Sequence, residues 1–260
     1  MTESPSPLII SGMLAANAPL EAPMRGFLER LVRQPQAHAK FMNMLSMLEH
    51  MGSRKIMVSQ MERTLTEDSL KHLAEEARHA YFFKRQAERI AGQTLDGYTE
   101  DNTMCRVPAL MYFGRLDAGI SARVLSSSSS RPKASQSEAG VEGSPCSKAE
   151  EGRSLDFARD EGKQKDPDNQ CYPWVSMIIE LRACWLYHMY HGVLEEAGVK
   201  LSLKSLLAEE DLHMAEMFDM VGENTALLQK LSAYETALFQ KFWTALSAEF
   251  SASVPSTQAA

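Results

Sequence analysis

Apolar residues recur every three or four positions along most of the chain, which places them on one face of an α-helix. The clearest stretch carries Met42, Leu45, Gly52 and Ile56 on the face that also holds Glu49. An unpaired carboxylate is costly to bury in an apolar stripe, so Glu49 must be paired, bind a metal or lie near an opening. The periodicity predicts helices over residues 24–33, 36–62, 67–91, 104–124, 173–197 and 224–250, and one more after Ser202. The sequence therefore predicts an all-α fold.

Three segments lack this pattern. Residues 1–23 contain several prolines among small residues and are predicted to be a flexible arm. Residues 126–169 begin with a run of serines and hold hardly any large apolar residue, which predicts a disordered insertion. Residues 251–260 are predicted to be a flexible tail. The remaining parts, residues 24–125 and 170–250, are expected to form one domain, each contributing a helical pair and one additional helix.

The sequence Leu-Ala-Glu-Glu-x-x-His occurs twice, at Leu73–His79 and at Leu207–His213. Residues three apart share a helix face, so each copy directs one carboxylate and one imidazole the same way. The capping pair Thr64 and Glu67 is expected to start the helix that carries the first copy. Two such pairs facing each other, with one Glu from each of two further helices, form a site for two metal ions.

The two further carboxylates are Glu49, which precedes the first copy, and Glu180, which precedes the second. Each is far enough from its copy to leave room for a helix, a turn and a returning helix. Oxygen donors with imidazole and without thiolate suit Fe or Mn better than structural zinc. The predicted metal ligands are Glu49, Glu76, His79, Glu180, Glu210 and His213.

This order of ligands resembles the ferritin-like di-iron carboxylate superfamily, over the four core helices only. The stretch Glu75-Glu76-Ala77-Arg78-His79 is also similar to the Glu-Glu-x-Arg-His stretch of acyl-carrier-protein desaturases, but this similarity is local. The resemblance implies a ferritin-like four-helix bundle with additional helices, whose pairs associate through a long crossover. It also implies two Fe ions, with Mn or a mixed Mn/Fe pair as alternatives, and O₂ activation.

Several assignments around these ligands stay open. His188 or His191 is an alternative to Glu180, and His72 lies one helical turn before Glu76, within reach of the same region. Tyr187 is a candidate catalytic residue behind the ligands, with a plain core tyrosine as the alternative.

The adjacent glutamates divide into two expected roles. Glu76 and Glu210 are expected to bridge the two ions. Glu75 and Glu209 lie about 100° around the helix from them and are expected to face solvent or to stand behind the ligands. Arg78 is expected to be an ion-pair partner.

Composition narrows the function classes. The chain has 260 residues, a net charge of −7 and a pI of about 5.6, which argues against a nucleic-acid binder. No run of about 18 apolar residues is present, so no membrane span is expected. The four cysteines form no CxxC pair and fit reduced thiols in a cytoplasmic protein: Cys105, Cys146, Cys171 and Cys184.

The function that these features favour is a di-iron oxidoreductase acting on a small organic substrate with O₂ and an electron donor of unknown identity. A monomer or homodimer is expected. The alternatives are a ferroxidase or other iron-handling protein, and a helical interaction bundle without metal.

Overall fold

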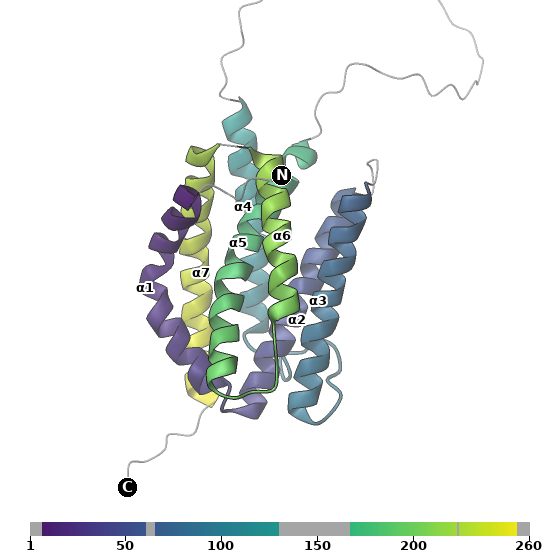
Figure 1. Cartoon of the computed structure of the whole chain (residues 1–260), viewed down its shortest axis with the longest axis vertical. Coiled ribbons are helices and arrows are strands. Elements are labelled where there is room, and N and C mark those ends of the chain that lie inside the picture. Colours follow the sequence, from purple (N-terminus) through teal and green to yellow (C-terminus); the bar gives the residue numbers. More distant parts are fainter. Residues whose placement is uncertain (1–6, 61–65, 130–166, 223, 254–260) are drawn as a thin grey trace, which may run out of the picture.

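The computed structural model describes residues 7–60, 66–129, 167–222 and 224–253. This part of the chain contains helices and no strand, so the all-α prediction is confirmed. The helices are α1 (Pro7–Leu31), α2 (Pro35–Gln60), α3 (Glu67–Ala91), α4 (Arg106–Ser129), α5 (Pro167–Glu196), α6 (Lys204–Val221) and α7 (Thr225–Ser253) (Figure 1).

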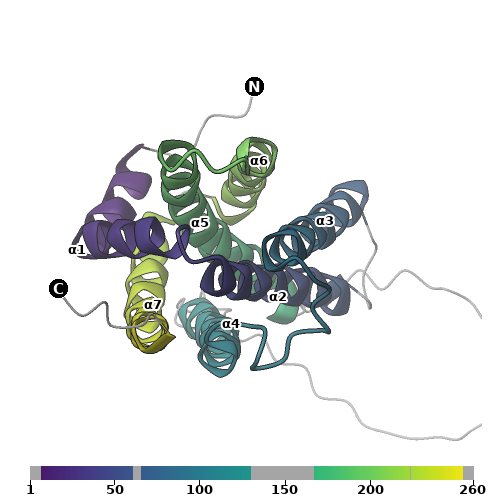
Figure 2. The same cartoon turned by 90° about the horizontal axis from the view of Figure 1, so that it is seen from below.

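The two helices that carry the repeated sequence, α3 and α6, contact each other, and each also packs along the helix that precedes it. Helix α2 packs along α3, and α5 packs along α6. Helix α5 lies near the centre and also contacts α1, α2, α4 and α7 (Figure 2). Segments distant in sequence are therefore brought to the region between α2, α3, α5 and α6.

Helix α3 is bounded by side-chain and backbone signals at both ends. Thr66 has an extended conformation and its hydroxyl accepts a hydrogen bond from the backbone N–H of Ser69 at 3.1 Å, while the Ser69 side chain accepts from the Thr66 backbone. The predicted pair of Thr64 and Glu67 is therefore wrong: Thr66 caps the helix, and Thr64 lies outside the described residues. Gly92, with φ of 69°, ends the helix in the left-handed conformation that glycine tolerates.

The predicted flexible arm over residues 1–23 is wrong from residue 7 onward, because α1 runs from Pro7 to Leu31. Pro19 and Pro23 lie inside this helix. The helix persists because its apolar face is buried, and Phe27 packs edge-to-face on Trp243 and Phe250 of α7 at 5.2 and 4.9 Å. The buried apolar residues of this face are Leu20, Met24, Phe27, Leu28 and Leu31. Residues 1–6 lie outside the described part.

The predicted insertion and the predicted tail both include residues that belong to helices in the structure. Residues 126–129 belong to α4 and residues 167–169 to α5. Residues 130–166, which make up most of the predicted insertion, lie outside the described residues. Helix α7 continues to Ser253, and residues 254–260 also lie outside.

A buried ion pair joins four helices. Arg182 of α5 donates from Nε and Nη2 to the two carboxylate oxygens of Glu235 on α7, at 2.8 and 2.6 Å. Tyr112 of α4 donates to the same carboxylate at 2.7 Å, and Asn17 of α1 accepts from Arg182 at 2.8 Å. Because all four side chains are buried, this network fixes the packing of α1, α4 and α7 around α5.

None of the described helices is both long and apolar enough to cross a membrane.

Candidate metal centre

The two copies of Leu-Ala-Glu-Glu-x-x-His face each other where α3 meets α6. Every side chain predicted as a ligand lies in one buried region between four helices, with at most 8% of its surface exposed. They come from α2 (Glu49), α3 (Glu76 and His79), α5 (Glu180) and α6 (Glu210 and His213).

The ligand atoms form two overlapping groups, each with its atoms within 4.8 Å of one another. The first group is Glu49, Glu76, His79 and Glu210, and the second is His72, Glu76, Glu180 and His213. Glu76 belongs to both groups, which is the position expected of a bridging ligand. Glu210 was expected to bridge as well, but the geometry places it in the first group only.

The separations between these atoms match those of ligands around common ions. The short contacts are His79 Nδ1 to Glu210 Oε1 at 3.1 Å, His72 Nε2 to Glu180 Oε1 at 3.3 Å and His213 Nδ1 to Glu76 Oε1 at 3.5 Å. Divalent first-row ions hold nitrogen and oxygen at about 2.1 Å, so two ligands at right angles around one ion lie about 3 Å apart.

Five atoms that face this region are buried and have no hydrogen-bond partner: His72 Nε2, Glu76 Oε1, His79 Nδ1, Glu210 Oε1 and His213 Nδ1. Buried polar atoms are normally satisfied, so each such atom needs an explanation. These atoms converge from α3 and α6 on one space, and a cation between them would satisfy them. The residues present therefore fit metal binding.

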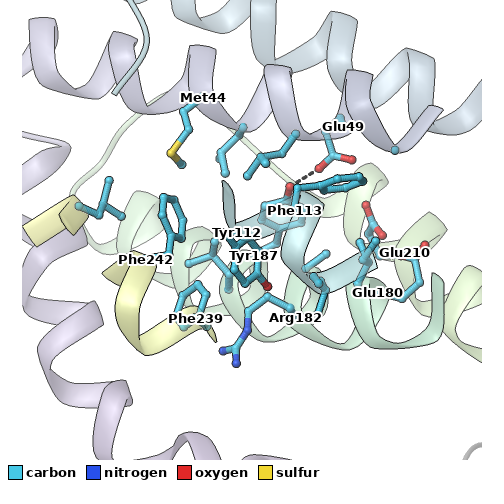
Figure 3. Close-up of a pocket in the computed structure, with 18 of the residues that line it drawn as sticks. Met44, Glu49, Tyr112, Phe113, Glu180, Arg182, Tyr187, Glu210, Phe239 and Phe242 are labelled. Carbon is cyan, nitrogen blue, oxygen red and sulfur yellow. Dashed lines mark hydrogen bonds between the residues drawn. The ribbon is translucent and has the colours of Figure 1, made fainter. Parts of the chain in front are cut away.

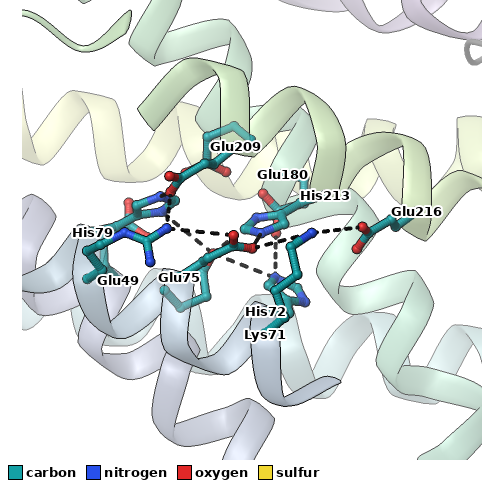
Figure 4. Close-up of polar contacts among 12 residues, drawn as sticks. Glu49, Lys71, His72, Glu75, His79, Glu180, Glu209, His213 and Glu216 are labelled. Atoms are coloured by element: carbon teal, nitrogen blue, oxygen red, sulfur yellow. Dashed lines mark hydrogen bonds and ion pairs between the residues drawn. The ribbon is translucent and has the colours of Figure 1, made fainter. Parts of the chain in front are cut away.

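A glutamate from the opposite copy of the repeat orients each of two histidines (Figure 4). His79 on α3 donates from Nε2 to Glu209 on α6 at 2.8 Å, and His213 on α6 donates from Nε2 to Glu75 on α3 at 2.7 Å. The expectation that Glu75 and Glu209 stand behind the ligands is met. Each hydrogen bond places the proton on Nε2 and leaves the lone pair of Nδ1 directed at the cluster.

Arg78, exposed over half of its side chain, joins these two glutamates at the surface. Its Nη2 lies 2.8 Å from Glu209 Oε2 and 3.6 Å from Glu75 Oε1. Lys71 on α3 and Glu216 on α6 form a second ion pair, in which Nζ lies 3.3 Å from Oε1. The outer side of the site is thus closed by ion pairs between α3 and α6.

His72 is the member of the cluster that the predicted ligand set omits. It precedes Glu76 by four residues on α3, so helical spacing alone places it on the same face. The hydroxyl of Tyr172 on α5 holds its Nδ1 at 2.9 Å, which directs Nε2 at Glu180. The four-residue spacing between His72 and Glu76 was the signal in the sequence. The hydrogen-bond partner of His72, Tyr172 on α5, becomes visible only in the folded chain.

The alternatives to Glu180 are placed elsewhere. His188 is exposed and lies 3.7 Å from Asp211, and His191 lies 3.3 Å from Glu195 near the end of α5. Glu180 is the α5 side chain in the cluster, because it points between α3 and α6 while the two histidines point toward other partners.

Tyr187 on α5 is fully within the core and donates its hydroxyl hydrogen bond to Oε1 of Glu49. It packs against Phe83 with ring centroids 5.3 Å apart. It thus holds one carboxylate of the cluster in place. Gly52, three residues after Glu49, leaves space for Glu76, since a Cβ there would lie 3.2 Å from Glu76 Oε2.

The carboxylates do not share one protonation state in the metal-free chain. Burial, reinforced by the neighbouring carboxylates, raises the pKa of Glu49 and of Glu210 well above the usual range. Burial raises the pKa of Glu180 to about 8. Burial acts the same way on Glu76, but its interactions with His72 and the other imidazoles outweigh it and lower the pKa. The four carboxyl groups therefore cannot all be ionised in this dry space unless positive charge compensates them.

The histidines supply part of that charge when no cation does. Burial lowers the pKa of His79, but its interactions with Glu210 and nearby carboxylates raise it to about 10. The pKa of His72 is likewise raised to about 9 by Glu76 and Tyr172 against the effect of burial. A cation bound here would displace these protons, which is the usual coupling between metal binding and proton release.

Comparison of the chain with protein-family models, with curated proteins and with solved structures finds no match. What the fold and the site define is a helical protein with a buried cluster of carboxylates and imidazoles suited to a metal.

Proposed function

We propose that this chain is a ferritin-like di-iron carboxylate oxidoreductase, which uses O₂ to oxidise a small organic substrate. The observation that carries the proposal is the set of buried ligand atoms without a hydrogen-bond partner that converge from α3 and α6, with further carboxylates from α2 and α5. The proposed bundle core consists of these four helices, with α1, α4 and α7 packed around it. Two Fe ions are the proposed cofactor, with Mn or a mixed Mn/Fe pair as alternatives.

A di-iron centre supplies O₂ activation when it is bound. The chain's own residues have separate tasks around it. Glu76, present in both ligand groups, ties the two positions together. Glu209 and Glu75 hold His79 and His213 in the tautomer that binds metal. Tyr187 holds a proton at its hydroxyl within hydrogen-bonding reach of Glu49.

The cavity next to the carboxylates favours an oxidoreductase over an iron-handling protein. Glu49, Glu76, Glu180 and Glu210 line one part of a cavity whose remaining wall is almost entirely apolar. Such a wall suits an organic molecule and offers a hydrated Fe(II) ion no polar route. The proposed enzyme takes electrons from a separate donor and is a monomer or a homodimer.

The test measures metal content and the optical spectrum of protein purified from iron-replete cells. About two Fe per chain are expected, the stoichiometry of a two-metal carboxylate site. Glu76→Ala should lose both ions, because its carboxylate belongs to both groups. Asp219→Ala, at an exposed position of α6 outside the cluster, is the matched control and should retain the wild-type metal content.

Metal content near zero after reconstitution, with the helical fold intact, would overturn the proposal and favour a metal-free interaction bundle. A large hollow oligomer that accumulates iron would instead favour iron handling. Equal metal loss in Glu76→Ala and Asp219→Ala would show that the cluster is not where the metal binds.

A further inference from the structure

A cavity extends from the carboxylate cluster into the apolar core between α2, α4, α5 and α7. Its volume is about 80 Å³, measured as the space open to the centre of a water-sized sphere. Figure 3 shows Glu49, Glu180 and Glu210 together at one end, with Met44 and Phe242 at the other end and the rings of Tyr112, Phe113 and Tyr187 between them. The cavity is therefore elongated and asymmetric, with a polar end and an apolar end.

The wall beyond the carboxylates is built from large apolar side chains of five helices. It includes Met24 of α1, Met44 and Leu45 of α2, Phe113 and Leu116 of α4, Leu186 of α5, and Phe239 and Phe242 of α7. These side chains are buried, so the apolar end lies within the core.

The remaining polar residues of the wall have their hydrogen bonds directed elsewhere. Tyr187 donates to Glu49, and Tyr112 donates to Glu235. Arg182 is bound through Nε and Nη2 to Glu235, and its guanidinium lies over the ring of Phe239 at 3.9 Å. Its Nη1 has no partner, but the guanidinium points away from the cavity in Figure 3. Outside the carboxylate end, a ligand thus finds no free hydrogen-bond donor in the wall.

A polar group placed at the apolar end would lose its water without gaining a partner, which is unfavourable. Burial of a methylene group there is favourable. We infer that the substrate is an aliphatic molecule whose distal end is plain hydrocarbon, held beside Met44 and Phe242, with its other end presented to the carboxylates. That the ligand is a substrate rests on the proposed function. The chemical class of the ligand follows from the cavity wall.

The test is calorimetric titration of the full metal-free chain with n-alkanols from butanol to decanol, and with the α,ω-diols of the same lengths, which carry a hydroxyl at both ends. The alkanol that binds most tightly should bind about tenfold or more tightly than the diol of its length, since the diol buries an unpaired hydroxyl. Leu116→Trp, which enlarges a side chain of the cavity wall, should weaken alkanol binding about tenfold. Leu125→Trp, at an exposed position of the same helix, is the matched control and should leave binding unchanged.

A second variant keeps the test decisive if Leu116→Trp does not fold. Phe242→Ala opens the apolar end and should move the tightest-binding n-alkanol to a longer chain. Equal binding of the alkanols and their diols, or equal weakening by Leu116→Trp and Leu125→Trp, would overturn the inference. Tighter binding of naphthalene than of any alkanol would also overturn it, in favour of an aromatic ligand.

The result separates the two proposals. Two bound Fe without any alkanol binding would leave the proposed function standing and overturn the aliphatic ligand. Alkanol binding that responds to Leu116→Trp, in a chain that takes up no metal, would support the ligand class and overturn the proposed function.

Discussion

His79 on α3 and Glu209 on α6 are joined by a 2.8 Å hydrogen bond, and the next residue along α6, Glu210, lies 3.1 Å from the other nitrogen of the same ring. Two consecutive residues of α6 thus contact the two nitrogens of an imidazole that α3 carries. The same relationship recurs in reverse, since Glu75 on α3 holds His213 on α6 at 2.7 Å. The repeated Glu-Glu pair therefore has two tasks: one carboxylate faces the cluster and the other orients the opposite histidine.

Removing an orienting carboxylate tests this relationship. Glu209→Ala should weaken metal binding about 10–100-fold while leaving every proposed ligand in place, because the His79 ring loses its fixed tautomer and orientation. Glu75→Ala should do the same through His213. Competitive titration with a metal-sensitive chelator measures the affinities, and Asp219→Ala, at an exposed position of α6, is the control. Wild-type affinity in both variants would contradict the crossed arrangement.

Glu49→Gln tests whether the carboxylates repel one another in the metal-free chain. The amide oxygen still accepts from Tyr187, but one carboxylate is removed from the cluster, so metal-free stability should rise or stay the same. The stabilisation by Fe(II) should fall; for an intact site it is about 2.7 kcal/mol at a free concentration about one hundred times Kd. Thermal melting with and without Fe(II) gives both quantities. A variant less stable without metal, and with an unchanged metal-dependent gain, would show that Glu49 is an ordinary core residue.

Gly52→Ala should have opposite effects on stability and on metal binding. Alanine favours a helix interior by about 1 kcal/mol over glycine, which stabilises the metal-free chain. Its Cβ would lie 3.2 Å from Glu76 Oε2, so the carboxylate shared by both groups must shift and metal affinity should fall. Gly114→Ala on α4 has no atom within 4 Å of the new Cβ and should raise stability without changing affinity. The idea fails if the two alanine variants bind metal equally well.

Glu235→Ala should destabilise the fold by about 3–5 kcal/mol, because it leaves the charge of Arg182 buried without a partner and removes the acceptor of Tyr112. Denaturant unfolding measures the loss. Glu29→Ala removes an exposed partner of Arg25 and should cost less than about 1 kcal/mol. Similar costs for the two variants would show that the buried network contributes no more than a surface ion pair.

His38 on α2 should give the protein a distinct loss of stability in mild acid. Burial beside Tyr190 lowers the pKa of His38 to about 4 from the ordinary 6.5. Because the folded-state pKa is depressed, this contribution is intact above about pH 6.5 and is lost as the pH falls toward about 4. At about pH 5 the loss amounts to about 2 kcal/mol.

Unfolding free energies of the wild type and His38→Gln at about pH 7.5 and about pH 5 isolate this contribution. The variant should lose about 2 kcal/mol less than the wild type over that interval. His50→Gln, at an exposed position of the same helix, should keep the wild-type response. Identical acid sensitivity of His38→Gln and the wild type would contradict the expected titration.

The sequence by itself determined the features that depend on short spacing. Helical periodicity located the helices, with the bounds of α3 matching residues 67–91, because the apolar face that packs a helix repeats every three to four residues. It also placed Glu76 with His79, and Glu210 with His213, since residues three apart lie on one face. The same rule placed His72 beside Glu76, and only its inclusion in the cluster was left open.

Only the tertiary structure decided the relationships between helices. The crossed pairs of Glu209 with His79 and Glu75 with His213 depend on how α3 and α6 are rotated toward each other, which no local spacing encodes. The choice of Glu180 over His188 depends in the same way on the orientation of α5. Helix α1 continues through its prolines because packing against α7 outweighs local propensity. The apolar cavity arises where side chains from five helices meet, and such a space has no signature in any one of them.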